Sequence, residues 1–593
     1  MKFKELAVYI SKIEETSSRL AITELLADIF KKLSPVEIHD AIYLLQGRVA
    51  PLFTKIESGM AEKMVIKSVA YSLNLEKKLF ENKYKKIGDL GATVEYFKKE
   101  IHSFDEKDLS VLEVYQELYK LAVASGPGSQ ETKIKILGNL VRQLDPLSCC
   151  YLVRIPMGVM RLGFSDMTVL DALGWMRTGD KSRRPEIERA YHVRPDLGFI
   201  AEQIKKEGID RIKSIKPKLF TPILMMRAER LSSASEIVEK IGRCAVEEKF
   251  DGFRLQVHYN GHEVKLYSRN LEEVSPMYPD IIAGVKKEIK ADNIILEGEA
   301  IGYDPVSGNF LPFQETVQRK RKYDIEEKAK EIPLKLFAFD LLYLNGKSCI
   351  EVPFAERRKE LISVIRAADK VRATILPAPE EITADAKRLE LLFDDAITKG
   401  LEGIVAKKLD GIYQAGARGW NWIKFKRSYS SKIEDTIDCL VMGYDYGKGK
   451  RTDFGIGAFL VGVFDEKADQ FVTVAKIGTG LTDEEWRQLK VKSSKFKIQK
   501  KPNNYLVDKA MECDVWVAPN IVVEIKADEI TRSPVHTAGR TLKSSKNGSA
   551  LEVDVPGFAL RFPRLQRFRD DKRPEDVTSL QELVGMFKAQ SHT

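Results

Sequence analysis

The sequence predicts a three-domain protein, with an all-α domain over residues 1–215, an α+β domain over 216–427 and a β-barrel domain over 428–593. A chain of 593 residues is too long for one hydrophobic core. The sequence pattern also changes near residues 215 and 428, from helical periodicity to mixed strands and helices and then to short strands. A content of 44% apolar and 31% charged residues is typical of a folded globular protein.

Helices predominate up to residue 215. Residues 5–33 and 34–49 place apolar side chains at i, i+3, i+4 and i+7, and Ser34 before Pro35 is a typical helix start. Gly-containing breaks at 88–95 and 124–131 separate the helices. No internal repeat and no long low-complexity segment is apparent. The first region is therefore predicted to be all-α.

Strands enter after residue 245. Residues 253–269, 293–304 and 334–346 alternate apolar with polar side chains or run continuously apolar, and helical segments such as 354–368 lie between them. From residue 428 onward, short apolar segments alternate with Gly-rich turns, which is typical of a small barrel. The middle region is therefore predicted to be α+β and the last region a β-barrel.

Charge and cysteine content restrict the partners and the compartment. The formal net charge is +9, which agrees with a polyanionic partner and equally with a mixed, well-solvated surface. Six cysteines without a CxxC pair or a Cys/His cluster argue against a structural zinc site and a disulfide framework. The N-terminus lacks a signal-peptide pattern and no apolar run approaches 18 residues, so we expect a cytoplasmic protein.

The sharpest local feature is Lys249-x-Asp251-Gly252-x-Arg254, which stands directly before a predicted strand. Asp-Gly favours a tight turn that would hold Lys249 and Arg254 against one ligand. A lysine becomes a nucleophile only when it is neutral, so neighbouring cations or a desolvated pocket are expected around Lys249. Taken alone, a surface lysine beside a hairpin turn explains this pattern as well.

Further motifs follow in order along the chain. They are Ser268-Arg269-Asn270, Glu297-Gly298-Glu299-Ala300, Phe337-Ala338-Phe339-Asp340, Glu402-Gly403-Ile404-Val405-Ala406-Lys407, Trp422-Ile423-Lys424-Phe425-Lys426, and Arg561-Phe562-Pro563-Arg564 with Arg569-Asp570-Asp571-Lys572. With Lys249, this series resembles the covalent nucleotidyltransferase superfamily of DNA ligases, RNA ligases and mRNA capping enzymes. The resemblance implies that Lys249 is the catalytic residue and carries AMP covalently.

Attack on an α-phosphate requires cations around the phosphates. The expected cofactor-binding cations are Arg254, Arg269, Arg418, Lys424 and Lys426. Arg418 stands in a loop of small residues, where a solvated arginine is the plain alternative. Lys424 and Lys426 alternate with apolar residues, so both face one side of a strand, as they would on any exposed strand face.

The remaining nucleotide contacts rest mainly on the resemblance. It implies that Glu299 contacts the ribose, that Phe339 stacks on adenine and that Glu247 reads adenine through its backbone. Glu297 and Phe337 share the strand faces of Glu299 and Phe339, so these choices lean on the motif alignment. The expected cofactors are ATP and Mg²⁺ or Mn²⁺, with metal ligands from Glu402, Asp251 and Glu299, because such cations prefer carboxylate oxygens.

The N-terminal region points to DNA among the possible substrates. Residues 151–163, and Gly88-Asp89-Leu90-Gly91 before them, resemble the DNA-binding domain of archaeal and eukaryotic replicative ATP-dependent ligases. Arg154 and Arg161 stand beside glycines and suit phosphate contacts, although each can equally be a surface charge. The barrel resembles an OB-fold, where Arg564 and Lys572 are further DNA-binding candidates.

The resemblance thus implies an ATP-dependent DNA ligase that seals nicks through a lysyl-AMP and a 5′-adenylylated DNA intermediate, in replication, repair and recombination. A GTP-using capping enzyme, a shorter RNA ligase, an NAD-dependent ligase with a cysteine zinc module and a DNA-binding protein without chemistry are the alternatives. Nicked duplex DNA is the expected partner of a monomer. A sliding clamp is a further candidate partner, although residues 101–104 match a clamp-binding motif poorly.

Overall fold

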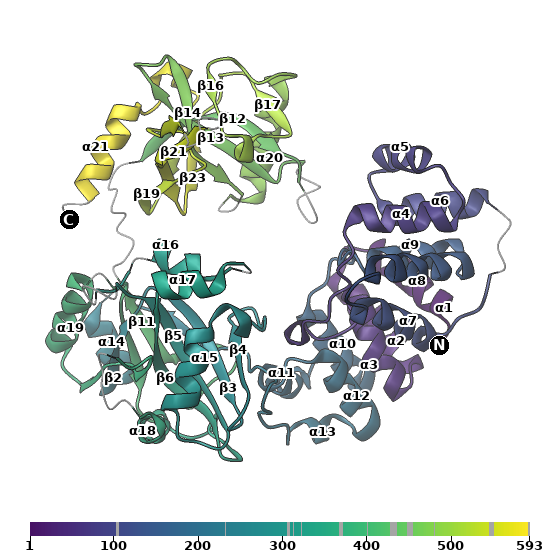
Figure 1. Cartoon of the computed structure of the whole chain (residues 1–593), viewed down its shortest axis with the longest axis horizontal. Helices are drawn as coiled ribbons and strands as arrows, with labels where there is room; N and C mark the ends of the chain where they lie inside the picture. The colour runs from purple at the N-terminus through teal and green to yellow at the C-terminus, as the bar shows by residue number, and fades with distance from the viewer. Residues whose placement is uncertain are drawn as a thin grey trace. The chain divides into compact units, whose positions relative to one another are not determined.

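The computed structural model divides the chain into two compact units, Met1–Lys426 and Arg427–Thr593. It describes residues 1–590 except 102–105, 232, 305–308, 312, 322, 367–371, 400, 427–435, 448–454, 479–480 and 545–550. The first unit holds a helical part followed by an α+β part, and the second unit is rich in strands (Figure 1). Within the described residues, no helix combines the length and apolar character needed to cross a membrane.

The helical part carries its apolar side chains on one face of each helix, as its periodicity predicts, and these faces form one continuous core. A capping box at Ser34 and Glu37 starts α3, with Pro35 at its first position. The helices are α1 Phe3–Glu14, α2 Arg19–Lys32, α3 Pro35–Leu45, α4 Glu62–Ser72, α5 Lys77–Ile87, α6 Leu90–Glu100, α7 Val111–Val123, α8 Ser129–Gln143, α9 Pro146–Arg154, α10 Asp166–Thr178, α11 Arg184–Val193, α12 Leu197–Glu207 and α13 Ile209–Ile212.

The helical part contains an internal repeat, so the expectation of a chain without one was wrong. Helices α1–α6 correspond in order to α7–α12. Residues 89–100 (DLGATVEYFKKE) and 196–207 (DLGFIAEQIKKE) are identical at seven of twelve positions. A Ser-Pro or Asp-Pro pair begins α3 and α9, and a glycine with positive φ follows each helix, at Gly47 and Gly158. Sequence divergence elsewhere hides the duplication.

The two repeats exchange helices. Helix α6 of the first repeat packs on α9 of the second, and α12 of the second packs on α3 of the first. The pairs α4 with α8 and α10 with α2 follow the same rule. Both α6 and α12 begin with Leu-Gly because a Cβ at Gly91 would lie 2.5 Å from the Cys150 carbonyl oxygen, and one at Gly198 would lie 2.8 Å from that of His39. These glycines permit the close helix crossings.

Two antiparallel sheets with short parallel pairs form the α+β part. The first has the strand order β1-β11-β10-β2-β9, and the second has the order β4-β3-β5-β6-β7 with β8 beside β6. Their strands are β1 Arg227–Arg230, β2 Cys244–Lys249, β3 Phe253–Tyr259, β4 Val264–Ser268, β5 Ile294–Gly302, β6 Leu334–Leu344, β7 Lys347–Ser348, β8 Ile375–Pro377, β9 Glu380–Thr383, β10 Gly403–Lys408 and β11 Arg418–Lys426.

Helices cover the outer face of each sheet. They are α14 Ala234–Ile241, α15 Pro279–Glu288, α16 Phe313–Thr316, α17 Ile325–Glu331, α18 Phe354–Val364 and α19 Ala386–Thr398. Helices α14 and α19 pack on the first sheet, and α15 and α18 pack on the second (Figure 1). A core that includes Met226, Tyr413 and Trp422 joins the two sheets to each other. The ends of the central strands β2, β5, β6 and β10 carry the candidate site.

The second unit is β-rich. One large sheet has the order β15-β17-β12-β13-β14-β16, with β18 between β12 and β23, and two separate two-stranded sheets pair β19 with β22 and β20 with β21. Its elements are β12 Ile437–Asp445, β13 Ala458–Asp465, β14 Gln470–Ile477, α20 Asp483–Lys495, β15 Lys497–Ile498, β16 Tyr505–Leu506, β17 Val515–Val517, β18 Val522–Lys526, β19 Glu529–Ser533, β20 Thr541–Ser544, β21 Leu551–Val555, β22 Gly557–Arg561, β23 Arg564–Phe568 and α21 Leu580–Gln590.

Candidate active site

Lys249 lies at the end of β2, where the chain turns sharply into β3. Its Nζ is 2.6 Å from Oε2 of Glu402, and both side chains are about one quarter exposed. The backbone N–H of Glu402 donates to the Lys249 carbonyl at 3.0 Å, so the two residues are also tied through the main chain. Gly252 makes the turn possible, because a Cβ there would lie 2.2 Å from the Ala300 carbonyl oxygen.

The immediate charged partner of Lys249 differs from the expectation. We expected neighbouring cations or a desolvated pocket to favour the neutral amine, whereas the structure places the carboxylate of Glu402 against a partly exposed lysine. This carboxylate accepts a hydrogen from the amine and is the group positioned to receive a proton when the amine reacts. The amine is therefore held at a fixed point between β2 and β10.

Glu299 completes the acidic side of the site. It lies on β5, directly opposite Arg254 in the antiparallel ladder. Burial raises the pKa of Glu299 to about 7, reinforced by the negative charges of Glu402 and Asp251 and opposed by Lys249 and Arg254. These five residues, Lys249, Asp251, Arg254, Glu299 and Glu402, are called the lysine site below.

The structure separates the two glutamates that the sequence left open. Glu297 is fully buried, and its carboxylate receives Arg254 Nη2 at 2.5 Å and the Tyr413 hydroxyl at 2.8 Å. Gln256 donates a third hydrogen bond to it at 3.2 Å. Glu297 is thus occupied by protein groups, whereas Glu299 is partly exposed beside Lys249. The geometry supports Glu299 as the ligand-binding carboxylate.

Arg254 is buried against the other side of the site. Nη1 donates to the Met226 carbonyl at 2.7 Å, and the guanidinium lies 5.2 Å from the ring centre of Phe339. Its Nε is buried without a hydrogen-bond partner among the described residues. An unsatisfied buried donor costs about 1–3 kcal/mol, and a bound anion or hydroxyl is one way to satisfy it.

The two phenylalanines of β6 have different surroundings. Phe337 stacks on Phe250 at 4.1 Å and is buried in the core of the first sheet. Phe339 is partly exposed. Trp422 contacts it in a T-shaped arrangement at 5.8 Å and 84°, and the Arg254 guanidinium and Lys407 Nζ lie 5.2 and 4.9 Å from its ring centre. A ring with an accessible face suits stacking on a flat base. The structure therefore supports Phe339 rather than Phe337 as the adenine contact.

Glu247 and Lys407 form a buried pair that the sequence reasoning did not identify as such. Lys407 Nζ is 2.6 Å from Oε2 of Glu247 and donates to the Phe339 carbonyl at 2.8 Å. Lys407 therefore links β2 of the first sheet to β6 of the second. Its position inside the motif at 402–407 was the only signal of a role in the sequence.

The other expected cations lie at the edges of this region. Arg269 is exposed on the turn after β4, Arg418 is exposed at the start of β11, and Lys424 is partly exposed further along β11. Lys426 pairs with Gly403 through its backbone, and its side chain lies outside the described residues. Arg227, beside Arg418 in the parallel ladder, is an additional exposed cation that sequence reasoning missed.

Comparison with known proteins assigns the chain to a family. Three family models match: "DNA ligase N terminus" over 2–174, "ATP dependent DNA ligase domain" over 225–426, and "ATP dependent DNA ligase C terminal region" over 452–572. A "Probable DNA ligase" of Dictyoglomus turgidum is 47% identical, and "DNA ligase 2" of Thermofilum pendens is 41% identical, each over 100% of this chain and 98% of the relative. The chain belongs to the ATP-dependent DNA ligases. Its reaction is the ATP-dependent joining of DNA ends.

Solved structures agree with this assignment at the level of the fold. A structure described as "Pmar-Lig_Pre." aligns over 95% of the ligase and 98% of its own chain, with a TM-score of 0.53 and 17% identity. At this identity the likeness establishes a shared fold. The ligase therefore has the three-part arrangement of helical, adenylation and β-rich regions that its family models also indicate.

Arg154, one of the two arginines expected to contact DNA from the helical region, is buried instead. Its guanidinium is held by Glu14 at 2.8 Å and Asp89 at 2.9 Å, and the residue is 6% exposed. The expectation that Arg154 contacts DNA is corrected, because a buried, paired guanidinium cannot reach a phosphate without breaking these bonds. Arg161 is half exposed and keeps its assignment as a candidate.

The candidates of the β-rich unit are at least partly exposed, and both are paired. Arg564 forms an ion pair with Asp528, and its side chain is about half exposed. Lys572 Nζ is 2.7 Å from Asp438, which also receives Arg569 at 3.1 Å. Both candidates therefore lie on the surface with a carboxylate beside them. Binding a phosphate there would require exchange of one anion for another.

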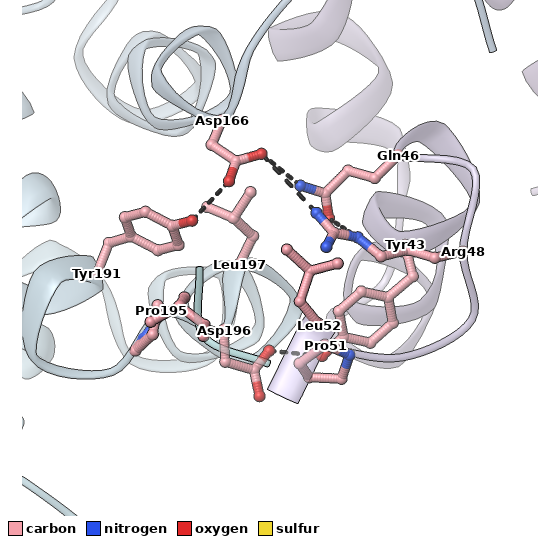
Figure 2. Close-up of a pocket in the computed structure, with 11 residues that line it drawn as sticks. Tyr43, Gln46, Arg48, Pro51, Leu52, Asp166, Tyr191, Pro195, Asp196 and Leu197 are labelled. Atoms are coloured by element: carbon pink, nitrogen blue, oxygen red, sulfur yellow. Dashed lines mark hydrogen bonds and ion pairs between the residues drawn. The ribbon is translucent and has the colours of Figure 1, made fainter. Parts of the chain in front are cut away.

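The cavity of Figure 2 lies in the helical region and has a different character. It measures about 20 Å³, enough for one water molecule. Asp166 accepts hydrogen bonds from Gln46 at 2.6 Å and Tyr191 at 2.6 Å, and Arg48 lies 3.9 Å from the same carboxylate. Polar groups from both repeats close the cavity. It is too small for a nucleotide and serves as part of the packing.

Proposed function

We propose that Lys249 is the residue that takes AMP from ATP and passes it to the 5′-phosphate of a nick in duplex DNA. The observation that carries the proposal is the position of its amine at a sharp turn, 2.6 Å from Glu402 and beside Glu299. A nucleophile held by a proton-accepting carboxylate is the arrangement that group transfer requires. The family membership supplies ATP and DNA as the reactants.

The proposed sequence has three balanced steps. Lys249 Nζ forms a bond to the α-phosphorus of ATP, the bond to pyrophosphate breaks, and the amine proton passes to Glu402. The 5′-phosphate of the nick then attacks the same phosphorus, the P–N bond breaks, and the lysine nitrogen takes the proton back from Glu402. Finally the 3′-hydroxyl attacks the nick phosphate and loses its proton to solvent, and AMP leaves with the P–O electron pair.

Other side chains would bind and orient the nucleotide. Glu299 accepts a ribose hydroxyl, Phe339 stacks on adenine, and Glu247 offers its backbone to the base edge. The cations Arg254, Arg269, Arg418, Lys424 and Lys426 neutralise phosphate charge. Each assignment is supported by a position on the strands that surround Lys249 or at their edges, as described above.

A divalent cation, Mg²⁺ or Mn²⁺, fits the chemistry of this site. Glu402, Glu299 and Asp251 offer the oxygen ligands that such cations prefer. The described residues contain no group of three or more His, Cys, Asp or Glu side chains placed to hold a metal ion. A cation there would share its coordination with phosphate and water, and it would supply charge neutralisation at the phosphates.

The remaining assignments concern the DNA. We propose that the helical region, residues 1–215, binds the duplex and that residues 216–427 form the adenylation domain. Residues 428–593 are proposed to form an OB-fold that carries Arg564 and Lys572 to the DNA. The β-rich topology and the exposed cations support this role. Residues 102–104 of the weak clamp-binding segment lie outside the described residues.

Covalent labelling tests the central assignment. The ligase is incubated with α-labelled ATP and Mg²⁺, denatured, digested and mapped by mass spectrometry under conditions that preserve the P–N bond. We expect one adenylylated peptide, with the adduct on Lys249. An adduct on another lysine, with Lys249 unmodified, would overturn the proposal.

A further inference from the structure

The internal repeat places two aspartates in equivalent positions. Asp89 begins α6 and accepts the Ala92 N–H at 2.6 Å, and Asp196 begins α12 and accepts the Phe199 N–H at 3.0 Å. Each caps its helix, and each is the first residue of the matching twelve-residue segment. The two positions therefore share backbone geometry and a capping role.

Both aspartates also bond a side chain of the other repeat. Arg154 Nη2 donates to Asp89 at 2.9 Å, and the Tyr43 hydroxyl donates to Asp196 at 2.5 Å. Figure 2 shows the second of these bonds. Tyr43 and Arg154 are 111 residues apart, as are Gly47 and Gly158, so they too are equivalent. The capping carboxylate thus joins the repeats at two symmetric points.

The symmetry ends at one additional cation. Oδ2 of Asp89 lies 3.1 Å from Nη1 of Arg161, whereas Asp196 forms no ion pair within the described part of the chain. Arg161 is 48% exposed on the loop after α9, and the Asp89 side chain is only 12% exposed. A buried carboxylate therefore holds one side of an arginine whose other side faces solvent.

Arg161 is held in place both by its backbone conformation and by its ion pair with Asp89. Its φ is +59°, in the left-handed region that side chains other than glycine rarely adopt. A free arginine loses about 2 kcal/mol of rotamer entropy when it is fixed, so an arginine already held in place binds a ligand at lower cost. Burial alone would raise the pKa of Asp89, but the Ala92 N–H and the Arg154 and Arg161 guanidiniums lower it below its usual value.

We infer that Asp89 is a positioning residue for DNA binding, which holds the Arg161 guanidinium toward a backbone phosphate of the duplex. The inference rests on the proposed DNA-binding role of the helical region. Asp89 does not touch DNA in this account, because its carboxylate is buried and occupied. It acts through Arg161. Arg154 pairs with Asp89 and also with the carboxylate of Glu14.

The matched variants are Asp89→Asn and Asp196→Asn. Asparagine caps a helix as well as aspartate does, so both changes keep the cap and remove only the charge. Binding of a labelled nicked duplex is measured by fluorescence anisotropy over a range of KCl concentrations, together with the thermal midpoint and ATP labelling of each full-length variant. The Arg161→Ala variant is measured as the reference.

We expect Asp89→Asn to weaken binding about 3- to 10-fold and to lower the salt slope toward that of Arg161→Ala, which loses one phosphate contact. Asp196→Asn should bind as wild type does, whatever its midpoint. The double variant Asp89→Asn/Arg161→Ala should bind no more weakly than Arg161→Ala, because the two residues act as one unit. ATP labelling should be unchanged throughout.

The outcomes distinguish the DNA-binding role of Arg161 from the positioning role of Asp89. If Arg161→Ala binds as wild type, the DNA-binding role of Arg161 fails and the inference fails with it. If Arg161→Ala weakens binding but Asp89→Asn does not, or if both asparagine variants weaken it equally, the positioning role alone is overturned. If Asp89→Asn does not fold, the double variant Asp89→Asn/Arg154→Met is compared with the single variant Arg154→Met. Both lack the Arg154 guanidinium, so neither contains a buried cation that has lost the charge of Asp89.

Discussion

Two carboxylates in this ligase have opposite electrostatic surroundings. Asp89 of the helical region is satisfied by a backbone N–H and two guanidiniums, which lower its pKa. Glu299 of the lysine site is partly exposed and lies beside two other carboxylates, and desolvation raises its pKa to about 7. The comparison teaches that unfavourable electrostatics are concentrated in the lysine site, where a bound substrate is expected to relieve them, whereas the carboxylate of the helical region is already neutralised by protein groups.

The largest expected effect breaks the chemistry without breaking the fold. Lys249→Ala should lower ATP labelling by more than about 10³-fold, because no other amine replaces the nucleophile. The thermal midpoint should change little, since Lys249 is partly exposed. Lys408→Ala, at an exposed lysine of the neighbouring strand β10, is the control and should label normally. Labelled Lys249→Ala would show that this lysine is not the nucleophile.

The opposite variant should break stability without breaking the chemistry. Arg154→Met removes the guanidinium that Asp89 and Glu14 share. The buried carboxylate of Asp89 then keeps Arg161 and the Ala92 N–H, and Glu14 on the surface keeps the Tyr151 hydroxyl. Removing one partner from a buried ion pair costs up to about 3–5 kcal/mol. Urea unfolding followed by circular dichroism measures the loss. ATP labelling per folded molecule should stay at the wild-type level. Unchanged stability would mean that water solvates these carboxylates in the folded protein.

Glu299→Gln sharpens the comparison through pH. The folded ligase keeps a proton on Glu299 between pH 4.5 and 7 that the unfolded chain has lost, so this group destabilises the fold increasingly as pH rises through that window. The variant should therefore match wild type near pH 4.5 and exceed its stability by about 1–3 kcal/mol above pH 7. Thermal midpoints at both pH values test this, and ATP labelling should fall. A constant difference would refute the raised pKa.

The smallest effect concerns the two phenylalanines of β6. Phe339→Leu should raise the KM for ATP about tenfold, because stacking on a base contributes about 1–3 kcal/mol. Phe337→Leu should leave that KM near the wild-type value and lower the thermal midpoint, since Phe337 packs in the core. Steady-state labelling over a range of ATP concentrations measures the KM of both variants, and thermal unfolding measures their midpoints. The reverse pattern would exchange their assignments.

Ordered motifs made the lysine site predictable from sequence, and burial explains most of what was missed. The resemblance of the ordered motifs to the nucleotidyltransferases pointed to residues that the structure brings together, including Glu299 and Glu402. Arg154 was misassigned because a buried, paired arginine and an exposed one look alike in a sequence. The direct ion pair between Lys249 and Glu402 was not expected, since pairing between β2 and β10 depends on a register that periodicity does not reveal.

The types of secondary structure in each region were predictable from the sequence, whereas the internal repeat of the helical region was not. Periodicity gave the change from helices to strands, and glycine-rich turns indicated the β-rich unit. The repeat is hard to predict from sequence because the identity is concentrated in residues 89–100 and 196–207, whereas the other helix pairs have diverged. The two segments that begin with Asp-Leu-Gly are the sequence feature that indicates the repeat.

The crossing of α6 onto α9 and of α12 onto α3 has a consequence for how the helical region comes apart. Neither half contains its own complete set of packing partners, so neither can melt while the other stays intact. A protease cut in the connection between α6 and α7 would leave two fragments that remain bound to each other. A destabilising change in one half would therefore affect the whole helical region at once.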